Sequence, residues 1–138
     1  ADLRTGAMLH RVEARTPPER ATQIADPTAH HHTPSHGVAV RPGGREVWVS
    51  ADVNGYVHVF DVTTLPPRQV ASVPLFKRPE HQPQPAWITF SLDGRFAVLS
   101  CNAIVDADTR KVVTRVDTSE RVVEIDFENG RPVRVGRH

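Results

Sequence analysis

The chain has 138 residues, which is enough for one domain with a sizeable core. Its 17 Lys and Arg residues almost balance its 16 Asp and Glu residues, which argues against a dedicated nucleic-acid-binding or anionic-membrane-binding protein. No run approaches the roughly 20 apolar residues of a membrane span, and the single cysteine, Cys101, excludes an internal disulfide and a multi-cysteine zinc site.

The apolar residues favour strands over helices. Val occurs 20 times, against 6 Leu and 4 Ile, and its branched side chain packs well on a pleated sheet. The 12 prolines interrupt the chain too often for long helices. We therefore expect an all-β chain of short strands.

The first elements in chain order are one strand and one long loop. Residues 1–13 begin with an Asp-x-x-Thr turn at Asp2 and Thr5, which leads into a short apolar stretch and predicts a single strand. Residues 14–35 lack apolar periodicity and predict a long polar loop, because most connections have only about 4–6 residues.

The next elements are two copies of one pattern, 50 residues apart. The segments SHGVAVRPGGREVWVS (35–50) and PAWITFSLDGRFAVLS (85–100) each contain an apolar run, a Gly-Arg turn and a second apolar run that ends in Ser. Each copy predicts a β-hairpin, because Gly supplies the positive φ of the turn. A further strand, an Asp-x-x-Thr turn and a last strand follow each hairpin. Residues 36–74 and 85–117 are therefore each predicted to form a four-stranded antiparallel sheet.

A weaker third copy ends the chain. Residues 120–136 contain the turn Asn129-Gly130-Arg131 between two apolar stretches. Four antiparallel strands for each repeat of about 40–50 residues are typical of a β-propeller blade. We therefore expect a partial β-propeller with two complete blades and parts of the flanking blades. Residues 1–13 would be the last strand of one blade, and residues 120–136 a terminal half-blade.

The segment SHGVAVRPGGREVWVSADVNGYVHVFDVTT resembles the YVTN-type β-propeller repeat proteins, a bacterial family related to lactonase-like and nitrite-reductase-like propellers. The matching positions are His36-Gly37, Pro42–Arg45, Val47–Ser50, Val59–Asp61, Ser91–Arg95 and Ile104–Asp106. The sequence departs from the family pattern at Gly43, where these repeats usually have Asp, and in the degenerate third copy. The resemblance implies a ring of about six to eight blades, of which this chain would hold the C-terminal ones.

A propeller needs at least four blades, so the expected partner is the set of remaining N-terminal blades of the same protein. These blades would pair with the exposed edges at both ends of the chain. The alternative is an oligomer of partial rings. The resemblance also implies a bacterial periplasmic or extracellular protein, although a chain with one cysteine fits the cytoplasm equally well.

A small-ligand site is predicted at the mouth of the central channel. His36 stands at the entrance of the innermost strand of one blade, and Trp87 stands at nearly the same place in the next. Arg78 and His81 precede Trp87 in a Pro-rich loop. Together these four residues are candidates for binding a small ligand or an anion. The alternative is that Trp87 packs between blades while the others form a surface loop.

The histidines at the end of the long loop suggest a divalent metal site. His30, His31, His32 and His36 have the side chains that bind Zn, Cu or Ni. Adjacent side chains alternate on an extended chain, so His32 pairs with either His30 or His36, and we expect His32 and His36 as the ligands. The alternative is a solvated polar loop without a cofactor.

The other polar and reactive residues have structural interpretations. Asp61 and Asp106 are expected to cap turns, His58 to lie in the core or at an edge, and Cys101 to be a partly buried, unreactive thiol. Glu124, Asp126 and Glu128 are expected on a solvated strand face.

No P-loop, G-x-S-x-G or H-E-x-x-H motif is present. The first functional hypothesis is therefore a non-catalytic repeat module that binds a small-molecule or protein ligand through its loop face. By resemblance, the alternatives are a lactonase-like hydrolase with a bound metal or a redox propeller with haem or quinone. The catalytic residues of either would lie mostly in the N-terminal blades.

Overall fold

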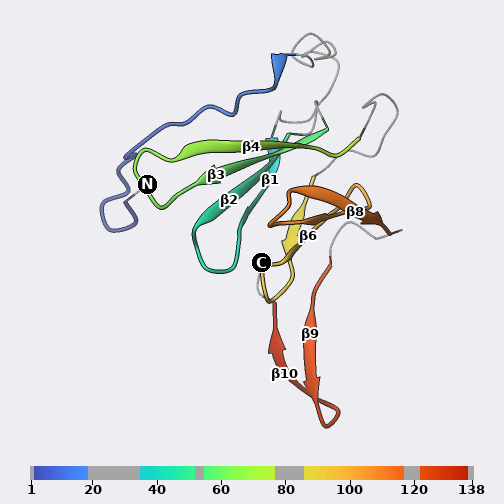
Figure 1. The fold of residues 1–138 in the computed structure, drawn as a ribbon. Coiled ribbons are helices and arrows are strands. Elements are labelled where there is room, and N and C mark those ends of the chain that lie inside the picture. Colours follow the sequence, from blue (N-terminus) through green and yellow to red (C-terminus); the bar gives the residue numbers. More distant parts are fainter. Residues whose placement is uncertain (1, 19–34, 52–54, 77–85, 117–121, 137–138) are drawn as a thin grey trace.

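The computed structural model of the chain describes residues 2–18, 35–51, 55–76, 86–116 and 122–136 (Figure 1). These residues form two antiparallel four-stranded sheets and a two-stranded hairpin. Within each sheet, consecutive strands pair with one another, so both four-stranded sheets are simple meanders. The prediction of an all-β chain built from antiparallel sheets is confirmed.

The strands follow the two sequence repeats. The first sheet, called sheet A, consists of β1 (Ser35–Val40), β2 (Glu46–Ala51), β3 (Tyr56–Asp61) and β4 (Arg68–Pro74). The second, called sheet B, consists of β5 (Ile88–Phe90), β6 (Phe96–Leu99), β7 (Ala103–Asp106) and β8 (Lys111–Arg115). The hairpin consists of β9 (Ile125–Glu128) and β10 (Arg131–Val135). Within the described residues, the sheets do not close into a ring.

Glycine sets the turn of the first hairpin in both sheets. Gly44 and Gly94 have φ values of 70° and 71°, a region that residues with a Cβ rarely adopt. Their amides donate to the carbonyl oxygens of Arg41 and Ser91, at 2.9 and 2.8 Å. The two repeats therefore reverse the chain with the same backbone geometry.

Aspartate sets the turn between the last two strands of each sheet. Asp61 Oδ1 accepts hydrogen bonds from the amide and hydroxyl of Thr63, at 2.8 and 2.6 Å. Asp106 Oδ1 accepts the corresponding bonds from Thr109, at 2.8 and 3.0 Å. The capping role expected of both aspartates is confirmed, although in the first repeat the partner is Thr63 rather than Thr64. These bonds lower the pKa of both carboxyls. The largest effect comes from the Thr63 side chain for Asp61 and from the Thr109 amide for Asp106.

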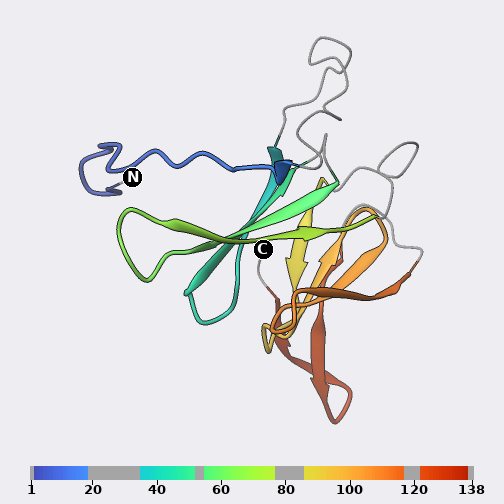
Figure 2. The ribbon, with the colours of Figure 1, turned by 45° about the horizontal axis from the view of Figure 1, so that its top comes forward.

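The main core lies between sheets A and B, which stand side by side (Figures 1 and 2). Trp48 of β2 is fully buried, and its ring meets that of Phe90 edge to face, with centroids 5.3 Å apart. Val59 and Val105 are also fully buried in this core. Sheet A thus contributes the face that carries Trp48, and sheet B the face that carries Phe90.

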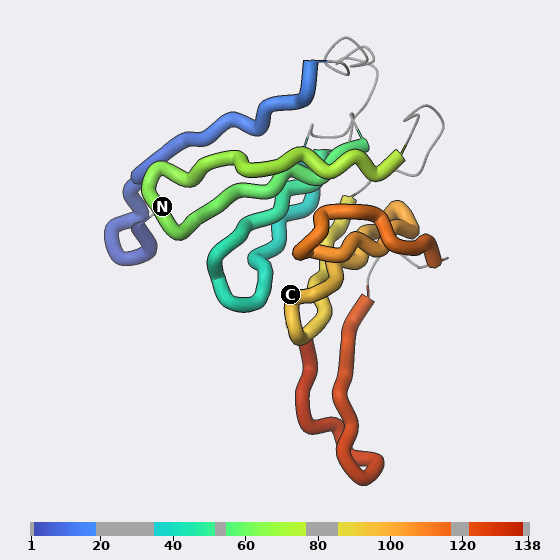
Figure 3. The backbone as a smooth tube through the Cα atoms, in the orientation of Figure 1, coloured from blue at the N-terminus to red at the C-terminus, as the bar shows by residue number. Residues whose placement is uncertain are grey.

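The N-terminal segment runs alongside β4 without forming a strand (Figure 3). This differs from the expected last strand of a blade in residues 1–13. A strand needs a ladder of backbone hydrogen bonds, whereas Arg15 reaches β4 through the Gln69 side chain. Gln69 accepts from the Arg15 amide at 2.7 Å and donates to the Arg15 carbonyl at 2.8 Å. No helix in the described part of the chain is long and apolar enough to cross a membrane.

Candidate functional site

The structure brings together His36 and Trp87, the two predicted ligand-site residues that it describes. His36 lies near the start of β1, and Trp87 directly precedes β5, so the two rings come from different sheets. Their centroids are 5.0 Å apart and their planes meet at 83°. His36 is exposed, and Trp87 retains 37% of its surface. The pair therefore presents an imidazole and an indole side by side at the surface.

Two serines at equivalent places in the repeats fix the backbone of this site. Ser50 Oγ accepts from the Gly37 amide at 2.7 Å and lies 3.2 Å from the Ala86 carbonyl oxygen, to which it can donate. Ser100 Oγ accepts from the amides of Ala86 and Trp87, at 2.9 and 3.0 Å. The serines therefore hold the residues next to both rings, and Ser50 also joins the two sheets.

Gly37 permits the close approach of the two sheets. A Cβ at this position would lie 2.1 Å from the Ala86 carbonyl oxygen and 3.0 Å from Ser50 Oγ. Real Cβ atoms do not approach a backbone oxygen so closely, so only glycine allows this spacing. His36 and Trp87 meet because the residue between the sheets has no side chain.

The other predicted site residues, Arg78, His81 and His32, lie outside the described residues. Among the residues that the structure describes, no group of three His, Cys, Asp or Glu side chains is placed to hold a metal ion. His36 is the described member of the expected metal pair with His32. The metal site therefore stays a prediction.

A groove that the sequence did not predict lies between the N-terminal segment and β4. It is an open groove of about 810 Å³, lined among others by Arg11, Arg15 and Arg68. Ser72 also lines it, and Ser72 Oγ lies 2.9 Å from Nδ1 of the buried His58. Burial lowers the pKa of His58 and so favours the neutral ring. His58 is therefore buried within sheet A, although it lies outside the main core between the sheets.

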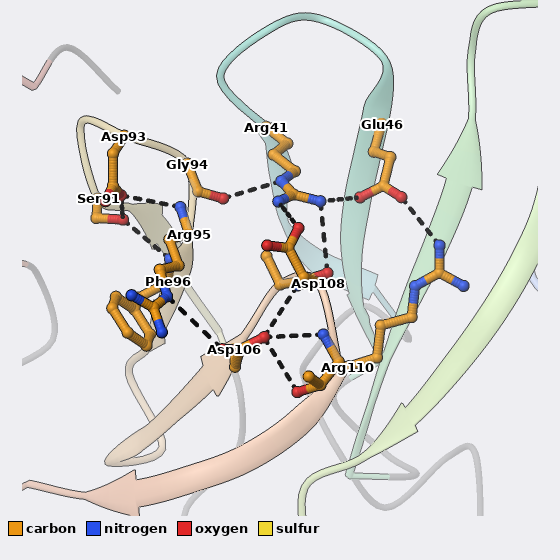
Figure 4. Close-up of polar contacts among 12 residues, drawn as sticks. Arg41, Glu46, Ser91, Asp93, Gly94, Arg95, Phe96, Asp106, Asp108 and Arg110 are labelled. Carbon is orange, nitrogen blue, oxygen red and sulfur yellow. Dashed lines mark hydrogen bonds and ion pairs between the residues drawn. The ribbon is translucent and has the colours of Figure 1, made fainter.

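An ion-pair network joins the sheets at the turns between β1 and β2 and between β7 and β8 (Figure 4). Arg41 Nε donates to the Gly94 carbonyl oxygen at 2.9 Å, and the guanidinium also pairs with Glu46 and Asp108. Arg110 donates to Glu46 Oε1 at 2.9 Å. Burial acts to raise the pKa of Glu46, but the bonds from Trp48, Arg110 and Arg41 outweigh it and lower the pKa. The charges are satisfied by one another, so this network stabilises the contact between the sheets.

The remaining reactive groups also have structural roles. Cys101 is buried, and burial raises the pKa of its thiol, which agrees with the expected unreactive cysteine. Asp126 pairs with Arg134 at 2.7 Å on the β9–β10 hairpin, as on a solvated strand face. Glu124 instead accepts a hydrogen bond from the Leu92 amide and so attaches the hairpin to sheet B.

The chain matches no protein-family model, and no curated protein sequence is significantly similar to it. Its functional interpretation therefore depends on the geometry of its own residues.

Proposed function

We propose that this chain is a non-catalytic β-propeller repeat module, and that it binds a small ligand at the loop face that carries His36 and Trp87. The observation that carries the proposal is the 5.0 Å separation of these two rings, which come from successive repeats and both reach the surface. Two four-stranded meanders that pack against each other and approach closely at Gly37 and Ala86 are consistent with two neighbouring blades.

The two rings favour a planar anionic ligand. An indole offers an apolar face for stacking and one N–H donor, and an imidazole donates or accepts a hydrogen bond. Arg78 and His81 precede Trp87 in the sequence, and the Arg78 guanidinium is the positive charge that an anionic ligand would require. The remaining blades of the ring would form the other walls of the channel mouth.

The test uses the fluorescence of the two tryptophans. Trp87 is part of the proposed site, whereas Trp48 is fully buried in the core between the sheets, so quenching by a bound ligand reports on Trp87. The protein is titrated with benzoate as a planar anionic probe and with cyclohexanecarboxylate as a non-planar one. We expect saturable quenching by benzoate that is at least about tenfold weaker in the His36→Ala variant.

The matched control is His10→Ala, because His10 is also an exposed histidine but lies in the N-terminal segment. Its benzoate affinity should equal that of the unmodified chain. Equal losses in both histidine variants, or quenching that does not saturate, would contradict a site at His36 and Trp87.

A further inference from the structure

Gln69 of β4 lies on the same face of sheet A as His58, because β4 contains one extra residue. Along β3, alternate residues share a face, so His58 and Phe60 point to the same side. The pairing of β3 with β4 shifts between Val59 and Phe60, and Val70 is the residue of β4 without a partner there. This β-bulge places Gln69 opposite Phe60, and therefore on the side of His58.

The amide group of Gln69 connects the buried histidine to the N-terminal segment. On one side it forms the two hydrogen bonds with the Arg15 backbone, in which Oε1 accepts and Nε2 donates. On the other side, Nε2 donates to Ser72 Oγ at 2.9 Å and lies 3.2 Å from His58 Nδ1. Nε2 carries two hydrogens, so one is directed to Arg15 and the other to Ser72 and His58.

These hydrogen bonds require a neutral His58. Because Ser72 Oγ accepts from Gln69, its own hydrogen can be donated to His58 Nδ1, which lies 2.9 Å away. Nδ1 is thus an acceptor, and the neutral ring carries its proton on Nε2. The ring is only 1% exposed, and burial lowers its pKa and so favours this neutral form.

We propose that His58 acts as a pH-sensitive latch for the N-terminal segment: the neutral ring holds Gln69 in the orientation that binds Arg15, and the protonated ring releases the segment. The latch does not depend on the ligand site proposed at His36 and Trp87.

Protonation of the ring reverses what it requires of the Gln69 amide. A protonated Nδ1 is a donor, and the Gln69 N–H that lies next to it is also a donor, so the two repel each other. Ser72 Oγ can accept from Nδ1, but the repulsion ends only when the amide turns over and presents Oε1 to the ring. Oε1 then leaves the Arg15 amide and Nε2 leaves the Arg15 carbonyl oxygen, so both hydrogen bonds to the segment are lost.

The other contacts of this part of the segment are loose. Residues 3–15 are all exposed. Val12 and Ala14 line an open hollow together with Val47, and so do not pack closely on sheet A. Loss of the two hydrogen bonds at Arg15 should therefore raise the detached fraction of the segment at least about tenfold.

Sheet B contains the same bulge but not the same polar residues. The pairing of β7 with β8 shifts at the corresponding place. The counterparts of His58 and Gln69 there are Ala103 and Val112, which belong to the main core or pack against it. The bulge is therefore common to both repeats, whereas the polar residues occur in the sheet along which the N-terminal segment runs. This distribution supports a role in holding the segment.

The titratable groups around His58 come from β3, β4 and the N-terminal segment, since β2 places the apolar Val49 opposite it. On β3, the Tyr56 ring stacks on the imidazole, with centroids 6.1 Å apart. His10 is the second histidine in the described part of these elements, and it therefore serves as the control. The charged residues that line the groove are exposed, which weakens their effect on the buried ring: Arg11, Glu13, Arg15 and Arg68.

The experiment follows the ¹⁵N-labelled 138-residue chain by NMR from about pH 7.5 to about pH 5, the range in which histidines titrate. The ring-proton shifts of His58 report its protonation, and the chemical shift and heteronuclear NOE of the Arg15 amide report release of the segment. We expect both to change with the same midpoint, and the detached fraction to rise at least about tenfold. The fluorescence of the buried Trp48 should stay constant over this range, which distinguishes release from unfolding.

Two variants separate the latch from other causes. His58→Gln keeps a polar side chain that does not titrate, so the Arg15 amide should no longer respond to pH. Gln69→Leu removes the amide from the edge strand, so Arg15 should be detached already at about pH 7.5, and this test remains even if His58→Gln impairs folding.

The matched control is His10→Ala, which removes an exposed histidine from the segment itself and should titrate like the unmodified chain. Three results would overturn the proposal: an Arg15 amide that stays bound while His58 is protonated, one that is released only when the chain unfolds, or one that remains bound in Gln69→Leu.

Discussion

The most direct test of the contact between the sheets is Gly37→Ala. The added Cβ would lie 2.1 Å from the Ala86 carbonyl oxygen, whereas carbon and oxygen normally stay about 3.3 Å apart. The sheets must therefore separate by about 1 Å at this point. Overpacking of this kind costs about 1–3 kcal/mol, and loss of the hydrogen bond between Ser50 and Ala86 adds about 1 kcal/mol. We expect a total loss of about 2–4 kcal/mol of unfolding free energy.

The assay is urea unfolding at fixed protein concentration, followed by the fluorescence of the buried Trp48. The control is Gly44→Ala, where no atom lies within 4 Å of the added Cβ but φ is 70°, so only backbone strain of about 1 kcal/mol is added. Gly37→Ala should also change the emission of Trp87, since it moves the neighbouring ring pair, and Gly44→Ala should not. The reasoning is refuted if the two variants lose equal stability and Trp87 emission is unchanged in both.

Three further predictions concern titratable groups in the core and the network. The bonds from Trp48 and Arg110 hold the pKa of Glu46 below its ordinary value despite burial, so the stability they add is present above about pH 4.5 and is lost as the pH falls below it. The free energy of unfolding in urea should show this loss for the unmodified chain but not for Glu46→Gln. Burial lowers the pKa of His58, so only the unfolded chain takes up a proton just below about pH 6.5. The free energy of unfolding should therefore fall from about pH 7 to 5, and it should depend less on pH in His58→Gln. Cys101 should react with a thiol reagent such as dithiobisnitrobenzoate only as fast as the chain opens, and rapid reaction of the folded protein would contradict its burial.

The sheets could be predicted because their signals are local. Gly44 and Gly94 fix hairpin turns, and Asp61 and Asp106 fix the turns of the outer strands, all within a few residues. Alternation of apolar residues then determines which strands form. In the segment 1–13, the described residues 2–13 have the same local pattern but form no strand, because strand formation also depends on backbone pairing that a local pattern does not determine.

The site could be predicted only in part. The repeat placed His36 and Trp87 at matching strand entrances, and the structure brings their rings together. The equivalence of Ser50 and Ser100 was visible in the sequence, but it carried no indication that both hydroxyls bind the backbone at these entrances. The groove between the N-terminal segment and β4 could not be predicted, because the Gln69 side chain joins its walls and the position of that side chain depends on the tertiary fold.

The two repeats differ at residues of the contact between the sheets, and these differences bear on the order in which the sheets pack. Identical repeats would allow either sheet to pack on another copy of itself. Such a contact would remove Arg110 from Glu46, and the carboxylate would lose its guanidinium partner although it is largely buried. An unpaired buried charge costs several kcal/mol, so this mismatched order is disfavoured. The ion pair between Glu46 and Arg110 therefore favours the order in which sheet B follows sheet A.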